Sequence, residues 1–289
     1  MTSLSASLVR GAVTSPFKRA GRPDATVPTG RLTRPAAPGP LAAYARICGF
    51  PESGPLPLTY PHVLAFPLTM RLMTGRAFPL PVLGLVHTWI EITPHRSVLP
   101  GEPLELSVYA EELTPHRRGT EVTMATEARV GGELVWESRS GYLSRHRQGA
   151  TAAGQATAAQ PPAPAAASAA ASAAASAAAE SLPARAEWTL PGDLGRRYGA
   201  VSGDRNPIHL HPLTARLFGF PRAIAHGMWT VARCLAEAGD AAEIRSVRAE
   251  FRAPVLLPAT VTYAADPTGG SFALRGPEGR VHLVGAVTR

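Results

Sequence analysis

The segment MWTVARCLAEAG, residues 228–239, carries apolar residues three or four positions apart, at Met228, Val231, Ala232 and Leu235. This spacing predicts a helix with one buried face, and Gly239 is a residue type that commonly ends helices. Four segments follow in which apolar and polar residues alternate: SVRAEFRA (246–253), TVTYAA (260–265), SFALRG (271–276) and RVHLVGAVTR (280–289). Because such alternation is typical of half-buried strands, the second half is predicted to be one buried helix followed by a sheet.

The first half of the chain repeats this order of elements. The helical pattern is LAFPLTMRLMTG (64–75), and the strand patterns are LVHTWIEI (85–92), LELSVYAE (104–111), TEVTMATEARV (120–130) and ELVWESRSGYLS (133–144). An internal repeat of this kind indicates two copies of one structural unit. We therefore expect an α+β chain in which each copy wraps a curved antiparallel sheet around one long helix, and in which the copies pair as a pseudo-dimer.

The repeat and its flanks divide the chain into four parts. Residues 148–182 are rich in Ala, Ser and Pro, and residues 148–180 lack large apolar side chains, which predicts a disordered linker. The two structural units are then residues 36–147 and residues 183–289. Residues 1–35 hold six basic residues against one acidic residue and are expected to form a partly ordered arm.

Composition limits the classes of partner. The 289 residues carry a formal net charge of +8, yet no arginine-rich run is interleaved with aromatics, which argues against nucleic-acid binding. No run of about 18 strongly apolar residues predicts a membrane span. The two cysteines, Cys48 and Cys234, lack metal-ligand spacing and are expected to be reduced and buried in a cytoplasmic protein.

One segment, SGDRNPIH (202–209), concentrates reactive side chains. Asp204 and His209 flank Asn206 and Pro207, and a residue before proline is pushed out of the helical region, so this segment is predicted to be a turn. Taken alone, Asp204 and Asn206 could serve only as turn and capping residues, with His209 on the surface. The context favours chemistry, because Gly227 lies near the start of the predicted helix, where free N–H groups suit a developing negative charge.

The surrounding string YGAVSGDRNPIHLHPLTARLFGFPRAIAHGMWT (198–230) resembles the hydratase-2 motif of the MaoC-like family of (R)-specific enoyl-thioester hydratases and 3-hydroxyacyl-thioester dehydratases. The resemblance implies the double hotdog fold, with Asp204 and His209 as the catalytic pair and Gly227 as the residue whose amide holds the thioester oxygen. It also implies a hydro-lyase of acyl metabolism that needs no cofactor and acts on acyl-CoA or acyl-carrier-protein thioesters.

The first copy lacks the reactive residues of the second. An alignment by eye places Phe50 opposite Asp204, Pro55 opposite His209 and, across a gap of six residues, Pro67 opposite Gly227. Proline has no N–H to donate. We therefore expect one active site per chain, with the first copy free to house the acyl tail near Gly84. A pseudo-dimer within one chain leaves both a monomer and a homodimer open.

Other polar residues are weaker candidates. Ser202 and Asn206 could orient Asp204 by hydrogen bonding. Arg248 and Arg252 could contact the phosphates of the thioester carrier, although each alone is more typical of a solvated strand face. His211 is expected to be exposed, and His226 to pack or cap beside the helix. Four other histidines lack ligand spacing, so no metal site is proposed: His87, His95, His116 and His146.

Two alternative functions remain. A non-catalytic acyl-thioester-binding protein could keep the same shape. A hotdog thioesterase would use Asp204 to activate water against the thioester carbonyl, and would release free thiol. The Asp-x-Asn-Pro-x-His string favours hydration over the thioesterase.

Overall fold

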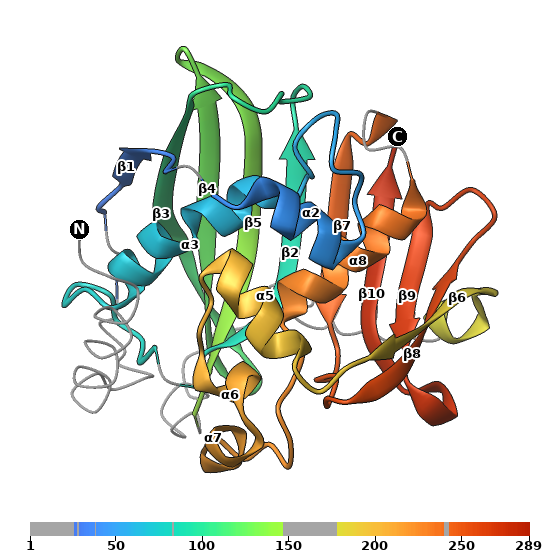
Figure 1. The fold of residues 1–289 in the computed structure, drawn as a ribbon. Helices are drawn as coiled ribbons and strands as arrows, with labels where there is room; N and C mark the ends of the chain where they lie inside the picture. Colours follow the sequence, from blue (N-terminus) through green and yellow to red (C-terminus); the bar gives the residue numbers. More distant parts are fainter. Residues whose placement is uncertain (1–25, 28, 38, 83, 147–177, 240–242) are drawn as a thin grey trace, which may run out of the picture.

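A ten-stranded antiparallel sheet forms the framework of the molecule (Figure 1). The structure, a computed structural model, describes residues 26–27, 29–37, 39–82, 84–146, 178–239 and 243–289. The strand order is β1-β3-β4-β5-β2-β7-β10-β9-β8-β6. The elements of the first half are β1 (Leu32–Pro35), α2 (Leu41–Cys48), α3 (Tyr60–Met73), β2 (Val86–Pro94), β3 (Leu104–His116), β4 (Gly119–Val130) and β5 (Glu133–Arg145).

The second half repeats this order and adds two short helices. Its elements are β6 (Ala184–Leu190), α5 (Leu194–Ser202), α6 (Pro207–Leu210), α7 (Pro212–Leu217), α8 (Gly227–Ala238), β7 (Ser246–Phe251), β8 (Ala259–Ala265), β9 (Ser271–Arg275), η4 (Pro277–Gly279) and β10 (Val281–Thr288). Outward from the centre of the sheet, strands 2, 5, 4, 3 and 1 correspond to strands 7, 10, 9, 8 and 6. The predicted repeat of elements is therefore present.

The two halves join edge to edge through β2 and β7. Trp89 pairs with Glu250 and Ile92 pairs with Val247 in this antiparallel contact. The two sheets expected from the sequence therefore form one continuous sheet. Because the join buries two strand edges, neither half exposes the edge that it would have alone.

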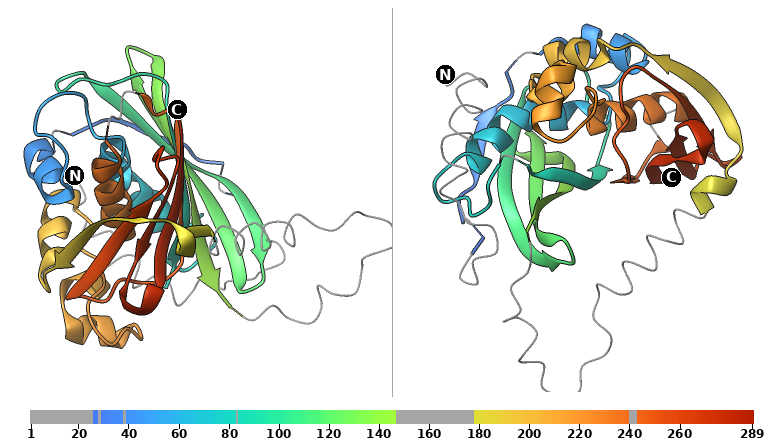
Figure 2. Two further views of the ribbon diagram at one scale, coloured as in Figure 1. Left: turned by 90° about the vertical axis from the view of Figure 1, so that its right-hand side faces the viewer. Right: turned by 90° about the horizontal axis from the view of Figure 1, so that it is seen from below.

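The helices cover one face of the sheet, as the side view shows (Figure 2). Helices α3 and α8 lie nearest to the strands, and α2 and α5 cross over them. On α8, Val231 and Leu235 are buried as expected, and Trp229 is also buried, whereas Met228 is only partly covered. The Trp229 indole N–H donates to the carbonyl oxygen of Ile47 at 2.9 Å and so ties α8 to α2 of the other half.

The two halves share one hydrophobic core. Tyr44 of α2 and Tyr198 of α5 are both fully buried, and their ring centroids lie 6.1 Å apart. Both cysteines, Cys48 and Cys234, are free and buried, as predicted. Since aromatic side chains from both halves fill the same interior, we expect the halves to unfold together rather than independently.

The predicted flanking segments are described only in part. Most of the predicted arm and residues 148–177 of the predicted linker lie outside the described residues. Within the arm, β1 pairs with β3. At the end of the predicted linker, residues 178–181 are helical and Ala179 packs against Ala273 and Val284, which differs from the disorder expected there. Within the described ranges, no helix is long and apolar enough to cross a bilayer.

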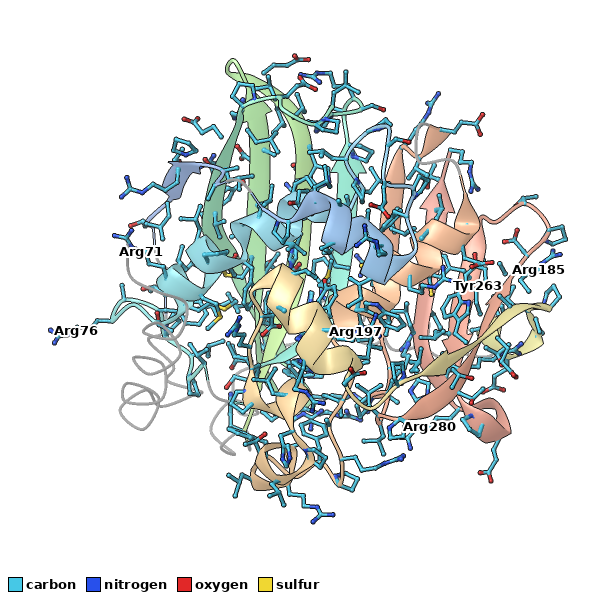
Figure 3. All side chains as sticks on the ribbon, in the orientation of Figure 1. Arg71, Arg76, Arg185, Arg197, Tyr263 and Arg280 are labelled. Atoms are coloured by element: carbon cyan, nitrogen blue, oxygen red, sulfur yellow. The ribbon has the colours of Figure 1, made fainter. Side chains whose placement is uncertain are left out.

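The arginines are distributed over both halves of the molecule. Figure 3 shows Arg71 and Arg76 at one side, Arg197 on α5 near the middle, and Arg280 near the opposite lower edge. A nucleic-acid-binding surface instead gathers its cations on one face or along one groove.

Two stacked histidines, the buried His62 of α3 and the partly buried His87 of β2, lie side by side. The rings of His62 and His87 are nearly parallel, with centroids 6.0 Å apart. Burial lowers the pKa of His62 to about 4; it also lowers the pKa of His87 to about 3, and the neighbouring His62 adds to this second shift. Both rings are therefore neutral in the folded protein well below the pH at which an unfolded histidine becomes charged.

This burial predicts that the protein loses stability in mild acid. As pH falls below about 6.5, the unfolded chain binds protons that the folded chain does not, so each histidine should lower the free energy of unfolding by about 2 kcal/mol at pH 5. We expect His62→Gln to remove its share of the change measured by urea unfolding between pH 7.5 and pH 5. His211→Gln, at an exposed position, serves as the control, and an unchanged pH slope in His62→Gln would contradict the prediction.

Candidate active site

The turn after α5 fixes the carboxylate of Asp204. Helix α5 ends at Gly203, which adopts the left-handed conformation (φ 76°) that favours glycine. The backbone N–H of Asp204 donates to Ser202 Oγ at 3.2 Å, and the backbone N–H of Asn206 donates to Asp204 Oδ1 at 3.1 Å. The Asp204 side chain is 26% exposed, so the carboxylate is held in place yet remains accessible.

Two glycines of α5 allow this turn to fold back against the helix. A Cβ atom on Gly195 would overlap the backbone carbonyl of His209, and one on Gly199 would lie 2.7 Å from the carbonyl oxygen of Asp204. Larger residues at either position would push the turn away from α5. The glycines of LGRRYGAVSGD therefore position both reactive residues.

His209 lies on α6 and presents one ring nitrogen. The Asn206 side chain caps this helix by accepting from the N–H of Ile208, and Pro207 begins it. His209 is buried, and its Nδ1 lies 2.8 Å from the carbonyl oxygen of Ile224. Because a carbonyl can only accept, Nδ1 carries the proton in this contact and Nε2 is left with a lone pair.

His226 supports both residues from the start of α8. Its ring stacks on His209 with centroids 3.6 Å apart, and its Nε2–H donates to the backbone carbonyl of Asp204 at 2.9 Å. From the sequence, His226 was expected to pack or cap beside the helix. The structure shows a closer role, because His226 is the N-cap residue of α8 and braces both Asp204 and His209. In the sequence, the position of His226 directly before Gly227 was the feature that could have indicated this role.

The three side chains converge on one small region. A carboxylate oxygen of Asp204 and one ring nitrogen each of His209 and His226 lie within 4.8 Å of one another. By distance alone such a group could hold a water molecule or coordinate a metal ion. The His226 nitrogen near the Asp204 carboxylate, Nε2 at 3.8 Å from Oδ2, already bonds to the Asp204 carbonyl, whereas His209 bonds to a carbonyl through Nδ1 and keeps the lone pair of Nε2.

The surroundings bring the pKa values of Asp204 and His209 closer together. Burial raises the pKa of Asp204, an effect that His209 and the Asn206 N–H partly offset. Burial lowers the pKa of His209, and Asp204 and the Ile224 carbonyl oppose this shift. Convergence of the two pKa values reduces the free-energy cost of moving a proton through the pair.

Gly227 is the first residue of α8 and approaches a neighbouring ring closely. N–H groups in the first turn of a helix have no carbonyl partner within the helix, so this amide can donate to a bound oxygen. A Cβ atom added to Gly227 would lie 2.8 Å from the ring of Phe251 on β7. Only glycine lets the helix start this close to the strand.

This contact predicts the effect of a methyl group at position 227. Gly227→Ala should displace either the helix start or the Phe251 ring, and we expect the proposed activity to fall about 10- to 100-fold in kcat/KM. Phe251→Leu in the same chain should restore part of the loss. Gly192→Ala is the matched control, because its Cβ would meet only Pro258 at 3.8 Å. Equal kinetics for Gly227→Ala and wild type would contradict the prediction.

The first half supplies one wall of the site, which the sequence did not indicate. Burial raises the pKa of Tyr142 on β5, and the charge of nearby Asp204 raises it further. Tyr142 stacks on His87 with centroids 4.6 Å apart, and His87 lies 4.7 Å from Phe251. The candidate catalytic residues Asp204, His209 and Gly227 are thus all in the second half, and side chains of the first half lie beside them.

Comparison with known proteins agrees with this geometry. A sequence profile described as MaoC like domain matches residues 173–275. The 3-hydroxyacyl-thioester dehydratase X of Mycobacterium tuberculosis is 38% identical to the chain over 271 residues, which are 92% of this chain and 89% of that protein. The chain belongs to the MaoC-like family.

Solved structures extend the relationship to the fold. The MaoC-like chain matches crystallised HtdX of Mycobacterium tuberculosis with a TM-score of 0.71 and 34% identity, over 89% of this chain and 99% of that one. A MaoC-like dehydratase of Phytophthora capsici matches with a TM-score of 0.69 and 20% identity, over 93% and 98% of the two chains, and supports the fold alone. The predicted double hotdog fold is confirmed.

Two expectations for this MaoC-like chain need correction. Pro67 lies inside α3, whereas Gly227 begins α8, so the alignment that paired them is wrong and the insertion in the second half is longer than six residues. Phe50 and Asp204 remain equivalent, since each follows a left-handed glycine that ends a helix, Gly49 or Gly203. Gly84 is exposed with open space around it, so it does not line an acyl tail site.

Arg248 and Arg252, the two predicted phosphate contacts, each form an ion pair with a glutamate of this MaoC-like chain. Arg248 lies 3.1 Å from Glu91 across the join between the halves, and Arg252 lies 2.7 Å from Glu250. Their charge is already compensated, which weakens the case for phosphate binding at either position. His211 is exposed as expected, and its ring caps α7 by accepting from the N–H of Leu213.

Proposed function

We propose that this chain catalyses the reversible addition of water to a trans-2-enoyl thioester, which gives the (3R)-3-hydroxyacyl thioester. The observation that carries this proposal is the convergence of the Asp204 carboxylate and a ring nitrogen of His209 within 4.8 Å, in a cluster whose third member, His226, directly precedes Gly227 at the start of α8. The name of the curated relative, a 3-hydroxyacyl-thioester dehydratase, supports it.

In the proposed reaction the Gly227 N–H donates to the thioester oxygen. The positive end of α8 and this hydrogen bond stabilise the charge that collects on the oxygen as the conjugated system is attacked. Asp204 and His209 hold the water, take one of its protons and direct its oxygen to C3. The pair then returns one proton to C2, so that H and OH add to the same face of the double bond.

Dehydration follows the same steps in reverse. The C2 proton is removed while charge develops on the thioester oxygen, and the 3-hydroxyl leaves as water after it receives a proton. Since the amide of Gly227 donates most strongly when that oxygen is most negative, it favours the transition state over the bound substrate. Proton transfer through Asp204 and His209 needs no redox change.

The test is hydration of crotonyl-CoA by the purified wild-type chain. We expect loss of the enoyl-thioester absorbance and formation of the (3R) alcohol, measured by chiral analysis of the hydrolysed product. Release of free thiol would instead identify a thioesterase. Binding of the thioester without loss of absorbance would identify a non-catalytic binding protein.

The thioester carrier and the setting are part of the same proposal. We propose an acyl-CoA or acyl-carrier-protein thioester as substrate, to be distinguished by kcat/KM on one acyl group attached to each carrier. The unpaired, buried cysteines support a cytoplasmic setting. We further propose a first unit at residues 36–147 without a catalytic pair, and a catalytic unit at residues 183–289 that works as a pseudo-dimer with it.

A further inference from the structure

The wall supplied by the first half contains buried polar atoms without hydrogen-bond partners. Among the described residues, His62 Nδ1, His87 Nε2 and Ser138 Oγ are buried and have no partner. His62 is 7% exposed and Ser138 is 3% exposed. Buried polar atoms are usually hydrogen-bonded, because leaving one unpaired is destabilising. Ser140 Oγ is a fourth such atom in the first half, and a bound group that reaches these atoms could satisfy them.

These atoms lie beside the proposed reaction centre. His87 is in ring contact with Phe251, and Phe251 is the ring that approaches Gly227. On its other side His87 stacks on Tyr142, whose pKa the charge of Asp204 raises. A series of contacts therefore runs from Gly227 through Phe251 to His87, and Tyr142 on the other side of His87 is close enough to Asp204 to feel its charge.

A stripe of polar side chains continues from this point into the first half. Residues two apart on a strand share a face, so Ser138, Ser140 and Tyr142 line one face of β5. The register pairs Tyr142 with His87 of the neighbouring strand β2. His62 reaches the same cluster from α3, where its ring stacks on His87. The stripe is thus bordered by the sheet on one side and by α3 on the other.

The stripe begins beside the place proposed for the reacting carbons. With the thioester oxygen placed at Gly227 and C3 at Asp204 and His209, an acyl chain that runs into the first half would meet Tyr142 and His87. A plain alkyl chain against this wall would cover the polar atoms without satisfying them. Protein sites with buried polar groups reject substrates that lack the matching hydrogen-bonding group.

We propose that the first half recognises an oxygenated acyl chain, with a hydroxyl group beyond the reacting carbons hydrogen-bonded by His62 and His87. A neutral histidine nitrogen is either a donor or an acceptor, depending on the tautomer, and a hydroxyl can satisfy both. This inference rests on the proposed function for the placement of the thioester, and it names the substrate class of that same site.

Matched ligand pairs of equal heavy-atom number test the inference without turnover. Calorimetric dissociation constants are measured for saturated ω-hydroxyacyl-CoA thioesters of six to nine carbons, each against the alkyl thioester that is one carbon longer. We expect the wild-type chain to bind the hydroxylated member at least about tenfold more tightly at one or more lengths. Tighter binding of the alkyl member at every length would overturn the inference.

Substitutions of single histidines test which residues produce the preference for the hydroxylated ligand. His87→Phe keeps a ring for the stack on Tyr142 but removes the nitrogen, and should abolish the tenfold preference. His95→Phe makes the same change at a partly exposed histidine that follows β2, and should leave the preference unchanged. If His87→Phe fails to show a wild-type circular dichroism spectrum, His62→Leu provides the same test from α3. A preference that survives in the folded variants of both histidines would overturn the assignment.

The outcome is independent of the proposed reaction. Hydration of crotonyl-CoA, whose chain ends at C4, reports on the reaction itself. Wild type that hydrates crotonyl-CoA but prefers alkyl ligands would retain the proposed function and lose this inference. Wild type that prefers hydroxylated ligands but hydrates nothing would do the opposite.

Discussion

Asp204→Asn should lower kcat/KM for hydration of crotonyl-CoA by about 10²- to 10⁴-fold, the range that general acid–base groups contribute. Asparagine has nearly the same shape as aspartate and can still accept the backbone N–H of Asn206 through its side-chain oxygen. What it loses is the charge and the ability to take a proton from water. The measurement is the initial rate of loss of the enoyl-thioester absorbance under conditions where rate is proportional to substrate.

The fold of this variant gives a second readout. Because burial raises the pKa of Asp204, the charged carboxylate is disfavoured in the folded protein, and its removal should leave the melting temperature equal or higher. Asp193→Asn, at the other end of α5, is the matched control and should retain wild-type activity. An Asp204→Asn protein that is folded and within threefold of wild type would exclude Asp204 from the catalytic pair.

The elements of the fold could be predicted because their signals are local. Val231 and Leu235 are four residues apart on a helix, and Leu104 and Leu106 are two apart on a strand, because in each case one face of the element is buried. Such a spacing of apolar residues can be recognised directly in the sequence. The join between β2 and β7 could not be predicted in the same way. Pairing between the edge strands of the two halves depends on tertiary geometry, and the pattern of apolar residues within one strand does not indicate it.

The same division explains the site. Asp204 and His209 are only five residues apart, so their proximity could be predicted from spacing, although the predicted turn becomes helical at Pro207 and His209 lies on α6. His87 and Tyr142, in contrast, reach the site only through the packing of the first half. The type of residue at position 206 also did not show which of its groups would contact Asp204. Asn206 was expected to orient Asp204 by hydrogen bonding, and it does so through its backbone N–H, while its side chain caps α6.

The length of the inserted segment explains the one wrong alignment. Proline at position 67 looked equivalent to Gly227 because short apolar strings on either side could be matched with a modest gap. In the structure the second half inserts two additional helices, α6 and α7, between the end of α5 and the start of α8. A short motif match cannot fix the size of such an insertion, because helices and loops of different lengths can connect the same two points.

His209→Asn should also lower kcat/KM about 10²- to 10⁴-fold, although it can keep the hydrogen bond that positions the side chain at residue 209. The asparagine amide can still donate to the carbonyl of Ile224, as Nδ1 does at 2.8 Å, but nothing replaces the Nε2 lone pair. His211→Asn is the matched control, since His211 is an exposed cap whose role asparagine can take. If Asp204→Asn and His209→Asn each abolish hydration and the double variant is no slower than either one, the two residues act as a unit. Independent, multiplicative losses would instead assign them to separate steps.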